Sequence, residues 1–345
     1  MKTRVVKVGD IKVGGGNPVI IQSMTKTDTR DVKATVQQIK KLEKAGCEIV
    51  RVAVPDLQAA EAIKEIKKKI KIPLVADIHF DYQLALAAIR SGADKIRINP
   101  GNMPADEVKE VCEAVKKAKI PVRIGVNTGS LKKVKNLADD LVDSALENVK
   151  LVEKFGVKDI VVSAKATDVE TTVKVYRELA KKTNYPLHLG VTEAGTFLSG
   201  TVKSSMAIGT LLQEGIGDTI RVSLSADPVE EVRVAQEILQ DLGLRQFRPE
   251  IITCPGCGRA EVDIWKLAKR VENTVKDIKK PLKIAVMGCV VNGIGEGKMA
   301  DFAVVGGKKC GLIMKKGEIV LKNIAEKNLM DELVKVLKSE NLEIS

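Results

Sequence analysis

The sequence predicts an α/β protein: an N-terminal (β/α)8 TIM barrel followed by a smaller C-terminal α/β domain. Two observations lead to this prediction. Between residues 17 and 242, a short apolar run followed by a charged amphipathic stretch recurs eight times. After residue 242 this rhythm stops and a different pattern begins. Eight regular βα units fit a closed barrel better than an open doubly wound sheet.

The apolar runs give the expected barrel strands, and the stretches between them give the expected helices. The runs cover residues 18–24, 48–54, 72–78, 95–99, 120–127, 159–164, 187–192 and 219–223. Residues 32–42 illustrate a helix, because apolar side chains recur there every three or four positions. Four aspartates stand where a side chain would cap a helix start: Asp31, Asp56, Asp168 and Asp227.

The remaining segments flank the barrel. Residues 1–16 predict a β-hairpin that turns at Gly14-Gly15-Gly16, and no helix pattern follows these glycines, which argues against a nucleotide-binding loop. The barrel domain is expected at 1–242, a linker at 243–249 and the second domain at 250–345. For the second domain the pattern predicts a helix over 262–278, strands over 282–287, 302–305 and 310–315, and a last helix from about 328.

Composition describes a soluble globular protein. Of 345 residues, 44% are hydrophobic and 30% charged, and no apolar run reaches the roughly 18 residues of a membrane span, so we expect a cytoplasmic protein. The formal charge of +12 fits a nucleic acid, an acidic protein or an anionic substrate. Five Phe, three Tyr and one Trp offer few surfaces for stacking bases, which argues against single-stranded nucleic acid.

Polar side chains stand at the expected carboxyl ends of the barrel strands, where TIM-barrel active sites lie. They are Arg51, Asp77, His79, Arg97, Asn99, Arg123, Asn127, Ser163, Lys165, Glu193, Arg221 and Ser223. Four arginines and a lysine around one mouth suit a phosphate or diphosphate. His79, beside Asp77, is a candidate to orient a substrate hydroxyl or move a proton, and Glu193 a candidate proton donor. His188 is expected in the core.

The cysteines of the second domain predict a metal centre. Cys254 and Cys257 form a Cys-x-x-Cys turn, and Cys289 follows in a glycine-rich segment. With Cys310 as a fourth ligand the set would suit structural zinc; with three thiolates it would suit an iron–sulfur cluster that keeps one exchangeable iron. Cys47 and Cys112 are expected to be buried small hydrophobic side chains.

At this point the motifs identify a family. Residues 253–259 (TCPGCGR) and 287–296 (MGCVVNGIGE) resemble the 4-hydroxy-3-methylbut-2-enyl diphosphate synthases of isoprenoid biosynthesis. The barrel agrees through 22–25 (QSMT), 76–80 (ADIHF), 97–102 (RINPGN) and 190–195 (GVTEAG), so the resemblance spans nearly the whole chain. Ile294 departs from the proline usual in the family and removes no ligand.

The resemblance implies an iron–sulfur oxidoreductase. A [4Fe-4S] cluster would be held by Cys254, Cys257, Cys289 and Glu296, which leaves Cys310 over. The substrate would be 2-C-methyl-D-erythritol 2,4-cyclodiphosphate, reduced with ring opening and loss of water. Its diphosphate would meet Arg51, Arg97, Arg123, Asn127, Lys165, Arg221 and Ser223, while Asp77, His79, Asn99 and Glu193 would face the carbon skeleton.

Partners follow from the same resemblance: flavodoxin or ferredoxin as electron donor, and a head-to-tail homodimer in which one subunit's cluster domain closes the other's barrel. Two rival readings remain. In a phosphate- or pterin-binding TIM-barrel transferase, the same mouth would bind the substrate and the C-terminal cysteines would form a structural zinc site. An RNA-binding module would explain the charge and leave the cysteines unused.

Overall fold

The computed structural model describes residues 2–131, 135–278 and 280–342. The chain forms two compact units, Met1–Arg245 and Gln246–Ser345, each described by itself below. The boundary between them falls inside the segment 243–249 that we expected to be a linker.

Parallel strands form the centre of the first unit. Among the described residues, eight strands pair in the order β8-β7-β6-β5-β4-β3-β10-β9. A parallel bridge from Val162 of β8 to Leu187, just before β9, joins the two ends of this order into a closed barrel. The strands are β3 (Ile20–Met24), β4 (Ile49–Ala53), β5 (Leu74–Asp77), β6 (Lys95–Ile98), β7 (Val122–Asn127), β8 (Ile160–Lys165), β9 (His188–Leu189) and β10 (Thr219–Ile220). The predicted (β/α)8 barrel is confirmed.

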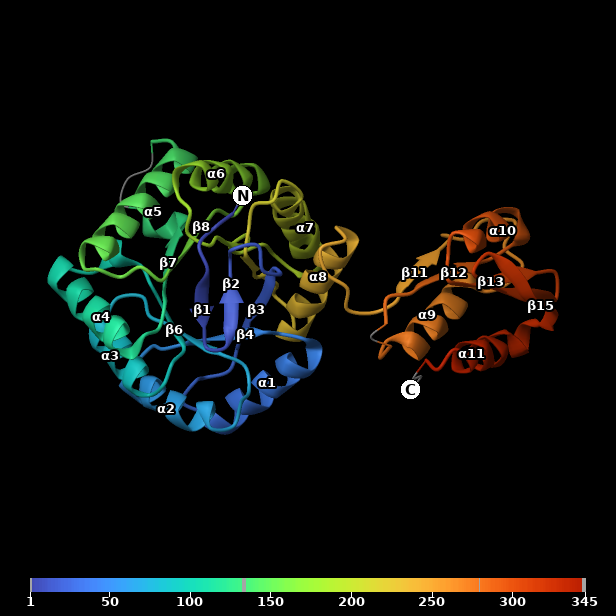
Figure 1. Ribbon diagram of the computed structural model, residues 1–345, viewed down its shortest axis with the longest axis horizontal. Coiled ribbons are helices and arrows are strands. Elements are labelled where there is room, and N and C mark those ends of the chain that lie inside the picture. Colours follow the sequence, from blue (N-terminus) through green and yellow to red (C-terminus); the bar gives the residue numbers. More distant parts are fainter. Residues whose placement is uncertain (1, 132–134, 279, 343–345) are drawn as a thin grey trace. The chain divides into compact units, whose positions relative to one another are not determined.

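Helices alternate with these strands and surround them (Figure 1). They are α1 (Val32–Ala45), α2 (Leu57–Lys67), α3 (Tyr82–Arg90), α4 (Ala105–Ala118), α5 (Leu137–Lys154), α6 (Val169–Lys182), α7 (Phe197–Gln213) and α8 (Pro228–Asp241). All four predicted aspartate caps are confirmed, since each accepts a hydrogen bond from a backbone N–H in the first turn. In the described part of the chain, no helix has both the length and the apolarity that crossing a membrane requires.

The N-terminal hairpin exists, but its predicted turn was wrong. Strands β1 (Val6–Val8) and β2 (Ile11–Val13) pair antiparallel, with Val8 opposite Ile11, so the chain turns at Gly9 and Asp10. Gly9 has φ of +56°, which a tight two-residue hairpin turn needs. The glycines at 14–16 follow the hairpin instead, and a Cβ on Gly14 would lie 2.3 Å from the carbonyl oxygen of Arg4.

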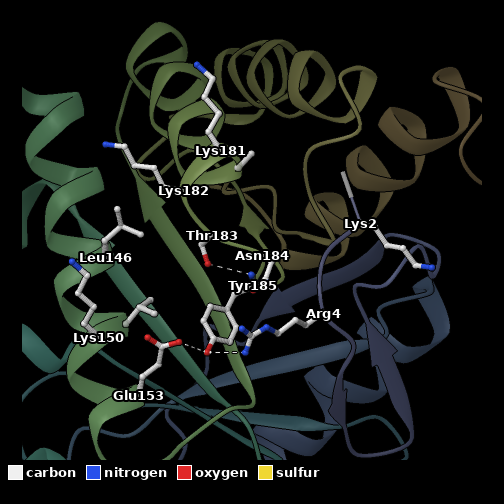
Figure 2. Close-up of a pocket in the computed structure, with 12 residues that line it drawn as sticks. Lys2, Arg4, Leu146, Lys150, Glu153, Lys181, Lys182, Thr183, Asn184 and Tyr185 are labelled. Carbon is white, nitrogen blue, oxygen red and sulfur yellow. Dashed lines mark hydrogen bonds between the residues drawn. The ribbon is translucent and has the colours of Figure 1, made fainter.

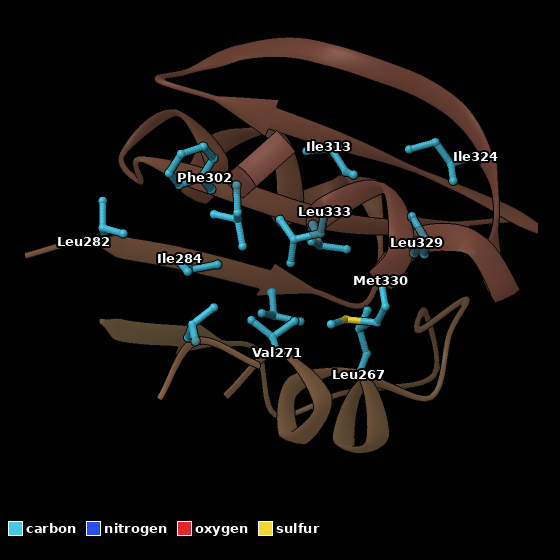
Figure 3. Close-up of a cluster of buried hydrophobic side chains, with 14 of the residues drawn as sticks. Leu267, Val271, Leu282, Ile284, Phe302, Ile313, Ile324, Leu329, Met330 and Leu333 are labelled. Atoms are coloured by element: carbon cyan, nitrogen blue, oxygen red, sulfur yellow. The ribbon is translucent and has the colours of Figure 1, made fainter. Parts of the chain in front are cut away.

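The second unit is built on a mixed sheet. Its described residues form five strands in sequence order, parallel from β11 to β13 and antiparallel from β13 to β15. The elements are β11 (Glu250–Thr253), α9 (Ile264–Val275), β12 (Lys283–Met287), α10 (Val290–Lys298), β13 (Phe302–Gly307), β14 (Cys310–Lys315), β15 (Glu318–Ala325) and α11 (Leu329–Ser339). Figure 3 shows apolar side chains of α9 and α11, among them Val271 and Leu333, meeting those of the strands in one buried core.

Three of these elements were not predicted. Strand β15 lies at the sheet edge and is mostly exposed, so it lacks the apolar signal of a buried strand. Strand β11 is only partly buried. Helix α10 was expected only as a glycine-rich stretch, because glycine disfavours helix interiors. Two of its glycines instead let the helix lie close against the sheet, since a Cβ on Gly293 would be 2.2 Å from Val305 Cγ1 and one on Gly297 would be 2.5 Å from Met314 Sδ.

This close packing predicts opposite effects of two matched substitutions in α10. Gly293→Ala is expected to lower the stability of the second unit by about 1–3 kcal/mol, because the added methyl overlaps Val305. Gly295→Ala meets no atom within 4 Å and is expected to leave stability unchanged or raise it by up to about 1 kcal/mol. Thermal unfolding of both variants measures the difference, and equal midpoints would contradict this account of α10.

Candidate active site

A polar pocket opens at the carboxyl-terminal ends of the barrel strands. Its volume is about 80 Å³, too small to enclose a diphosphate, so a substrate would also occupy the open mouth above it. Ten of the twelve residues proposed from the sequence line it, together with Thr192. The ten are Arg51, Asp77, His79, Arg97, Arg123, Asn127, Ser163, Lys165, Arg221 and Ser223.

Strand pairing brings these side chains together. Arg97 on β6 pairs in register with Asp77 on β5 and with Arg123 on β7, so the three stand side by side across the barrel wall. Asn127 at the end of β7 is likewise level with Lys165 at the end of β8. Gly125 makes room for this arrangement, since a Cβ there would lie 2.3 Å from Arg97 Nε. Residues as far apart in sequence as Arg51 and Ser223 therefore face one space because parallel strands end at one rim.

Asp77 is the buried carboxylate of the pocket. Its oxygens lie 3.1 Å from Arg97 Nη1, 3.6 Å from Arg51 Nε and 3.7 Å from His79 Nε2. Burial works against ionisation, but Arg51, the nearby His79 imidazole and Arg97 outweigh it and hold the pKa of Asp77 well below its usual range. Asp77 therefore stays ionised at physiological pH and orients the arginines around it.

Arg123 has buried N–H donors without acceptors. Its side chain is 1% exposed, and Nε and Nη1 have no hydrogen-bond partner among the described residues. Arg97 Nε likewise has no hydrogen-bond partner among the described residues, although Arg97 Nη2 donates to the carbonyl oxygen of Gly125 at 3.0 Å. Because unpaired buried donors are costly, such groups in a pocket indicate a ligand that supplies acceptors. An anion with several oxygens meets that requirement.

Lys165 is a buried amine in the same pocket. Its Nζ lies 3.3 Å from Nε2 of His188, whose Nδ1 is 2.7 Å from the Thr219 hydroxyl. Burial first, and then the positive charges of Arg123 and Arg221, lower the pKa of Lys165 well below its ordinary value. His188 is buried with hydrogen-bond partners, as predicted, and it contacts Lys165 from inside the barrel.

The lowered pKa of Lys165 predicts that anion binding takes up a proton. A bound anion offsets the repulsion from the arginines and raises the pKa, so protons are taken up between the free and bound pKa values. Affinity should therefore fall as pH rises through the pKa in the complex. Sulfate, which does not titrate near neutral pH, is the probe, and calorimetry in Tris and in HEPES counts the protons. Lys165→Met should abolish the buffer dependence; its persistence in the variant would contradict this role.

Glu231 is a site residue that the sequence reasoning missed. It lies in the first turn of α8, is 1% exposed and accepts hydrogen bonds from Arg221 Nη2 at 3.1 Å and Nε at 3.3 Å. Its Oε2 also accepts from the Ser23 hydroxyl at 3.0 Å. Arg221 Nη1 in turn donates to Ser223 Oγ at 2.6 Å. Glu231 therefore fixes the position of Arg221, and Arg221 that of the Ser223 hydroxyl. In the sequence, Glu231 resembles an ordinary acidic residue of a helix start.

Two proposed residues do not line the pocket. Asn99 is buried and accepts a hydrogen bond from Asn148 Nδ2 at 3.3 Å, beside the short 3-10 helix Pro100–Asn102. Glu193 is exposed, directly after the lining residue Thr192, and has φ of +51°. This backbone conformation is uncommon for a residue with a side chain and places Glu193 on a turn at the rim.

The cysteines of the second unit collect at one end of its sheet. Cys254 follows β11, Cys289 follows β12 by two residues, and Cys310 begins the antiparallel strand β14 at the same end. Two sulfur atoms accept backbone N–H groups: Cys254 Sγ from Gly288 at 3.3 Å and Cys257 Sγ from Arg259 at 3.5 Å. Hydrogen bonds to sulfur are typical of thiolate ligands of iron–sulfur clusters. All six cysteines are free, and Cys47 and Cys112 are buried as predicted.

The donor set fits an iron–sulfur cluster, although the side chains are not gathered around a single point. Within residues 2–131, 135–278 and 280–342, no three His, Cys, Asp or Glu side chains form a ready metal site. Glu296 lies exposed on α10, seven residues after Cys289. The fit rests on three free thiols from two neighbouring strand ends, two of them already accepting backbone N–H groups.

Fold and pocket together define a TIM-barrel enzyme with a cationic pocket at its mouth. Family models match the GcpE TIM-barrel domain over residues 3–236 and the GcpE protein C-terminal domain over 250–339. The chain belongs to the GcpE family, as the motif resemblance implied.

Curated relatives agree over nearly the whole length. A 4-hydroxy-3-methylbut-2-en-1-yl diphosphate synthase (flavodoxin) of Caldanaerobacter subterraneus subsp. tengcongensis is 57% identical, covering 96% of this chain and 96% of its own. A protein of the same name from Fusobacterium nucleatum subsp. nucleatum is 56% identical, covering 99% and 98%.

Solved structures give the fold of the barrel alone. Dihydropteroate synthase of Yersinia pestis superposes with a TM-score of 0.52 at 11% identity, covering 69% of this chain and 97% of that one. The Stenotrophomonas maltophilia enzyme gives 0.53 at 13% identity, with 68% and 98% covered. Identity this low shows a shared barrel and lends no support to the alternative of a pterin-binding transferase, which the full-length relatives do not favour.

Proposed function

We propose that the chain is an oxidoreductase that converts 2-C-methyl-D-erythritol 2,4-cyclodiphosphate into 4-hydroxy-3-methylbut-2-en-1-yl diphosphate, the product named in its relatives. In this reaction the bond between C2 and the diphosphate oxygen breaks and the C3 hydroxyl leaves as water. Two electrons form the C2–C3 double bond, and one proton is consumed. The observation that carries the proposal is the buried Arg123, whose unpaired donors face a pocket of cations.

Binding of the diphosphate is assigned to the cationic side of the pocket. Arg51, Arg97, Arg123, Lys165 and Arg221 surround it, and each arginine can donate two parallel hydrogen bonds to phosphate oxygens. Asn127 and Ser223 add neutral donors at the rim. Holding the leaving diphosphate among these donors lowers the barrier to breaking its bond to carbon, because the charge that develops on oxygen meets a fixed positive field.

Proton delivery is assigned to the other groups at the mouth. Asp77 is held ionised, so it orients Arg97 and His79 and does not itself donate the proton. His79 is half exposed, with Nε2 2.8 Å from Arg97 Nη1, and can contact a substrate hydroxyl. Glu193 stays our candidate for the proton donor to the leaving water, since it stands at the rim next to Thr192. Asn99 would hold the loop that follows β6.

The electrons require a cofactor, which we propose to be a [4Fe-4S] cluster held by Cys254, Cys257, Cys289 and Glu296. Such a cluster supplies single electrons at low potential. The thiols at the ends of β11 and β12 and the N–H groups that Gly288 and Arg259 donate to sulfur support this ligand set. The relatives' printed name supports flavodoxin as the electron donor.

We further propose a head-to-tail homodimer in which the cluster unit of one subunit covers the barrel mouth of the other. Exposed apolar side chains support it: Phe80, next to His79, is 70% exposed, Leu198 of α7 is 74% exposed, and Val291, two residues after Cys289, is 63% exposed. Mixing Glu193→Ala subunits with Cys289→Ala subunits should restore part of the activity. Complete inactivity of verified mixed dimers would refute a shared site.

Turnover tests the proposed reaction directly. Protein kept without oxygen and reconstituted with iron and sulfide is supplied with reduced flavodoxin and the cyclodiphosphate. ³¹P NMR then follows the phosphorus signals. The expected result is loss of the cyclic diphosphate signals and growth of those of a linear diphosphate monoester, only when reductant is present. Unchanged cyclodiphosphate in the presence of an intact, reducible cluster would overturn the assignment.

A further inference from the structure

His188, the buried histidine of β9, joins two polar groups inside the barrel. Its Nε2 lies 3.3 Å from Lys165 Nζ, and its Nδ1 lies 2.7 Å from the Thr219 hydroxyl. Among the residues that the structure describes, His188 is the one hydrogen-bond partner of the Lys165 amine. What the imidazole offers to this amine therefore affects how Lys165 can bind an anion.

Contacts from other elements fix the position of β9, which is only two residues long. The Tyr176 hydroxyl of α6 donates to the carbonyl oxygen of His188 at 2.6 Å. The hydroxyl of Tyr185, three residues before His188, accepts from Arg4 Nη1 at 3.2 Å and donates to Glu153 Oε1 at 2.6 Å, as Figure 2 shows. The backbone that carries the imidazole is therefore held in place before an anion binds, which lowers the cost of binding.

The strand pairing and one glycine set the two neighbours of the imidazole. Thr219 stands opposite His188 where β10 pairs with β9, so its hydroxyl lies beside the ring. A Cβ on Gly190 would lie 2.6 Å from Lys165 Nζ, closer than two nonbonded atoms approach. Lys165 can therefore reach the imidazole because residue 190 carries no side chain.

The charge of the amine decides where the ring proton must lie. A charged ammonium group only donates hydrogen bonds, so it requires an unprotonated Nε2 as acceptor. The ring proton then lies on Nδ1 and is donated to Thr219 Oγ1. Burial first, and then the positive charge of Lys165, lower the pKa of His188 well below its ordinary value, which keeps the ring neutral. Further positive charges act on the amine or the ring: Arg51, Lys95, Arg97, Arg123 and Arg221.

We propose that His188 is a positioning residue of the anion site: in the anion-bound protein its Nε2 accepts a hydrogen bond from the charged Lys165 amine, and Thr219 holds the ring in the tautomer that this requires. This role rests on the proposed binding of the diphosphate by Lys165 and involves no bond of the substrate. Without the imidazole acceptor, the charged amine would face cations and the bound anion alone, so charging it would cost more free energy.

Two amide substitutions separate this role from core packing. The amide of His188→Gln reaches the place of Nε2 and can accept from Lys165, whereas the amide of His188→Asn reaches only the place of Nδ1. Calorimetry on the whole chain with sulfate should find His188→Gln within about twofold of the parent chain and His188→Asn weakened roughly tenfold, because a hydrogen bond is stronger from a charged amine than from a neutral one. The affinity of His188→Asn should also begin to fall at a lower pH.

A Lys165→Met background shows whether His188 acts through Lys165. There, neither His188 substitution should change the sulfate affinity by more than about twofold, because the partner of the imidazole is gone. Thr219→Val, which has nearly the same shape, carries the test if His188→Asn does not fold. It should weaken sulfate binding roughly three- to tenfold in the parent chain and have no effect beside Lys165→Met.

The proposal is overturned if His188→Gln and His188→Asn bind sulfate alike, or if the loss in His188→Asn persists beside Lys165→Met. Sulfate that does not bind the parent chain at all would overturn it together with the anion pocket. Sulfate binding needs neither a cluster nor turnover, so a failed turnover assay would refute the proposed reaction and leave this result standing. Circular dichroism of each variant verifies that the fold is retained.

Discussion

Replacing Arg123 by Met is expected to lower kcat/KM for the cyclodiphosphate by roughly 10²- to 10⁴-fold. Two buried donors of Arg123, Nε and Nη1, lack partners until an anion arrives. Each hydrogen bond to a charged group contributes roughly 1.5–3 kcal/mol, and losing two gives this range. The expected loss is therefore larger than for any rim residue of the pocket.

The Arg123→Met protein should still fold. Methionine fills similar space without a buried charge, so the melting temperature is expected to hold or rise. Arg177→Met on the outer face of α6 is the matched control, because Arg177 is exposed and pairs with Glu214. A kcat/KM within threefold of the parent chain for Arg123→Met would show that the diphosphate binds elsewhere.

The second large effect is expected at the C-terminal cysteines. Cys289→Ser should lower turnover more than about 100-fold, because serine is a poor ligand for iron where a thiolate is required. Cys310→Ser, at the same end of the sheet, should stay within about threefold, since the proposed ligand set leaves Cys310 out.

Pyrophosphate binding distinguishes anion binding in the barrel pocket from cluster binding at the C-terminal cysteines. The barrel pocket draws all its lining residues from the first unit, so neither cysteine variant should change the affinity for pyrophosphate. Equal loss of turnover in Cys289→Ser and Cys310→Ser would contradict the three-cysteine set and favour a four-thiolate site.

The barrel and most of its pocket could be predicted from the sequence because parallel strands carry two clear signals. Each strand is an apolar run buried on both faces, and polar residues at its end have no structural reason to be there. Arg97 and Lys165 were therefore visible as site residues from their place in the chain alone, and the structure puts both in the pocket.

What could not be predicted depends on contacts that the sequence does not display. Glu231 acts through Arg221, and only the folded barrel brings the first turn of α8 to that side chain. The turn at Gly9 and the helix α10 could not be predicted because a glycine can occur in a turn, a loop or a closely packed helix. Which of these it forms depends on neighbouring atoms, such as those of Val305 beside Gly293. Glu193 sits on the rim because its turn takes φ of +51°, which the strand pattern does not reveal.

Iron and sulfide content and the visible spectrum, measured on protein purified without oxygen, determine whether the second unit holds an iron–sulfur cluster. We predict brown protein with broad absorbance near roughly 400 nm and about four irons and four sulfides per chain. Colourless protein that holds about one zinc per chain after attempted reconstitution would contradict the proposed cluster and show that the cysteines form a structural zinc site.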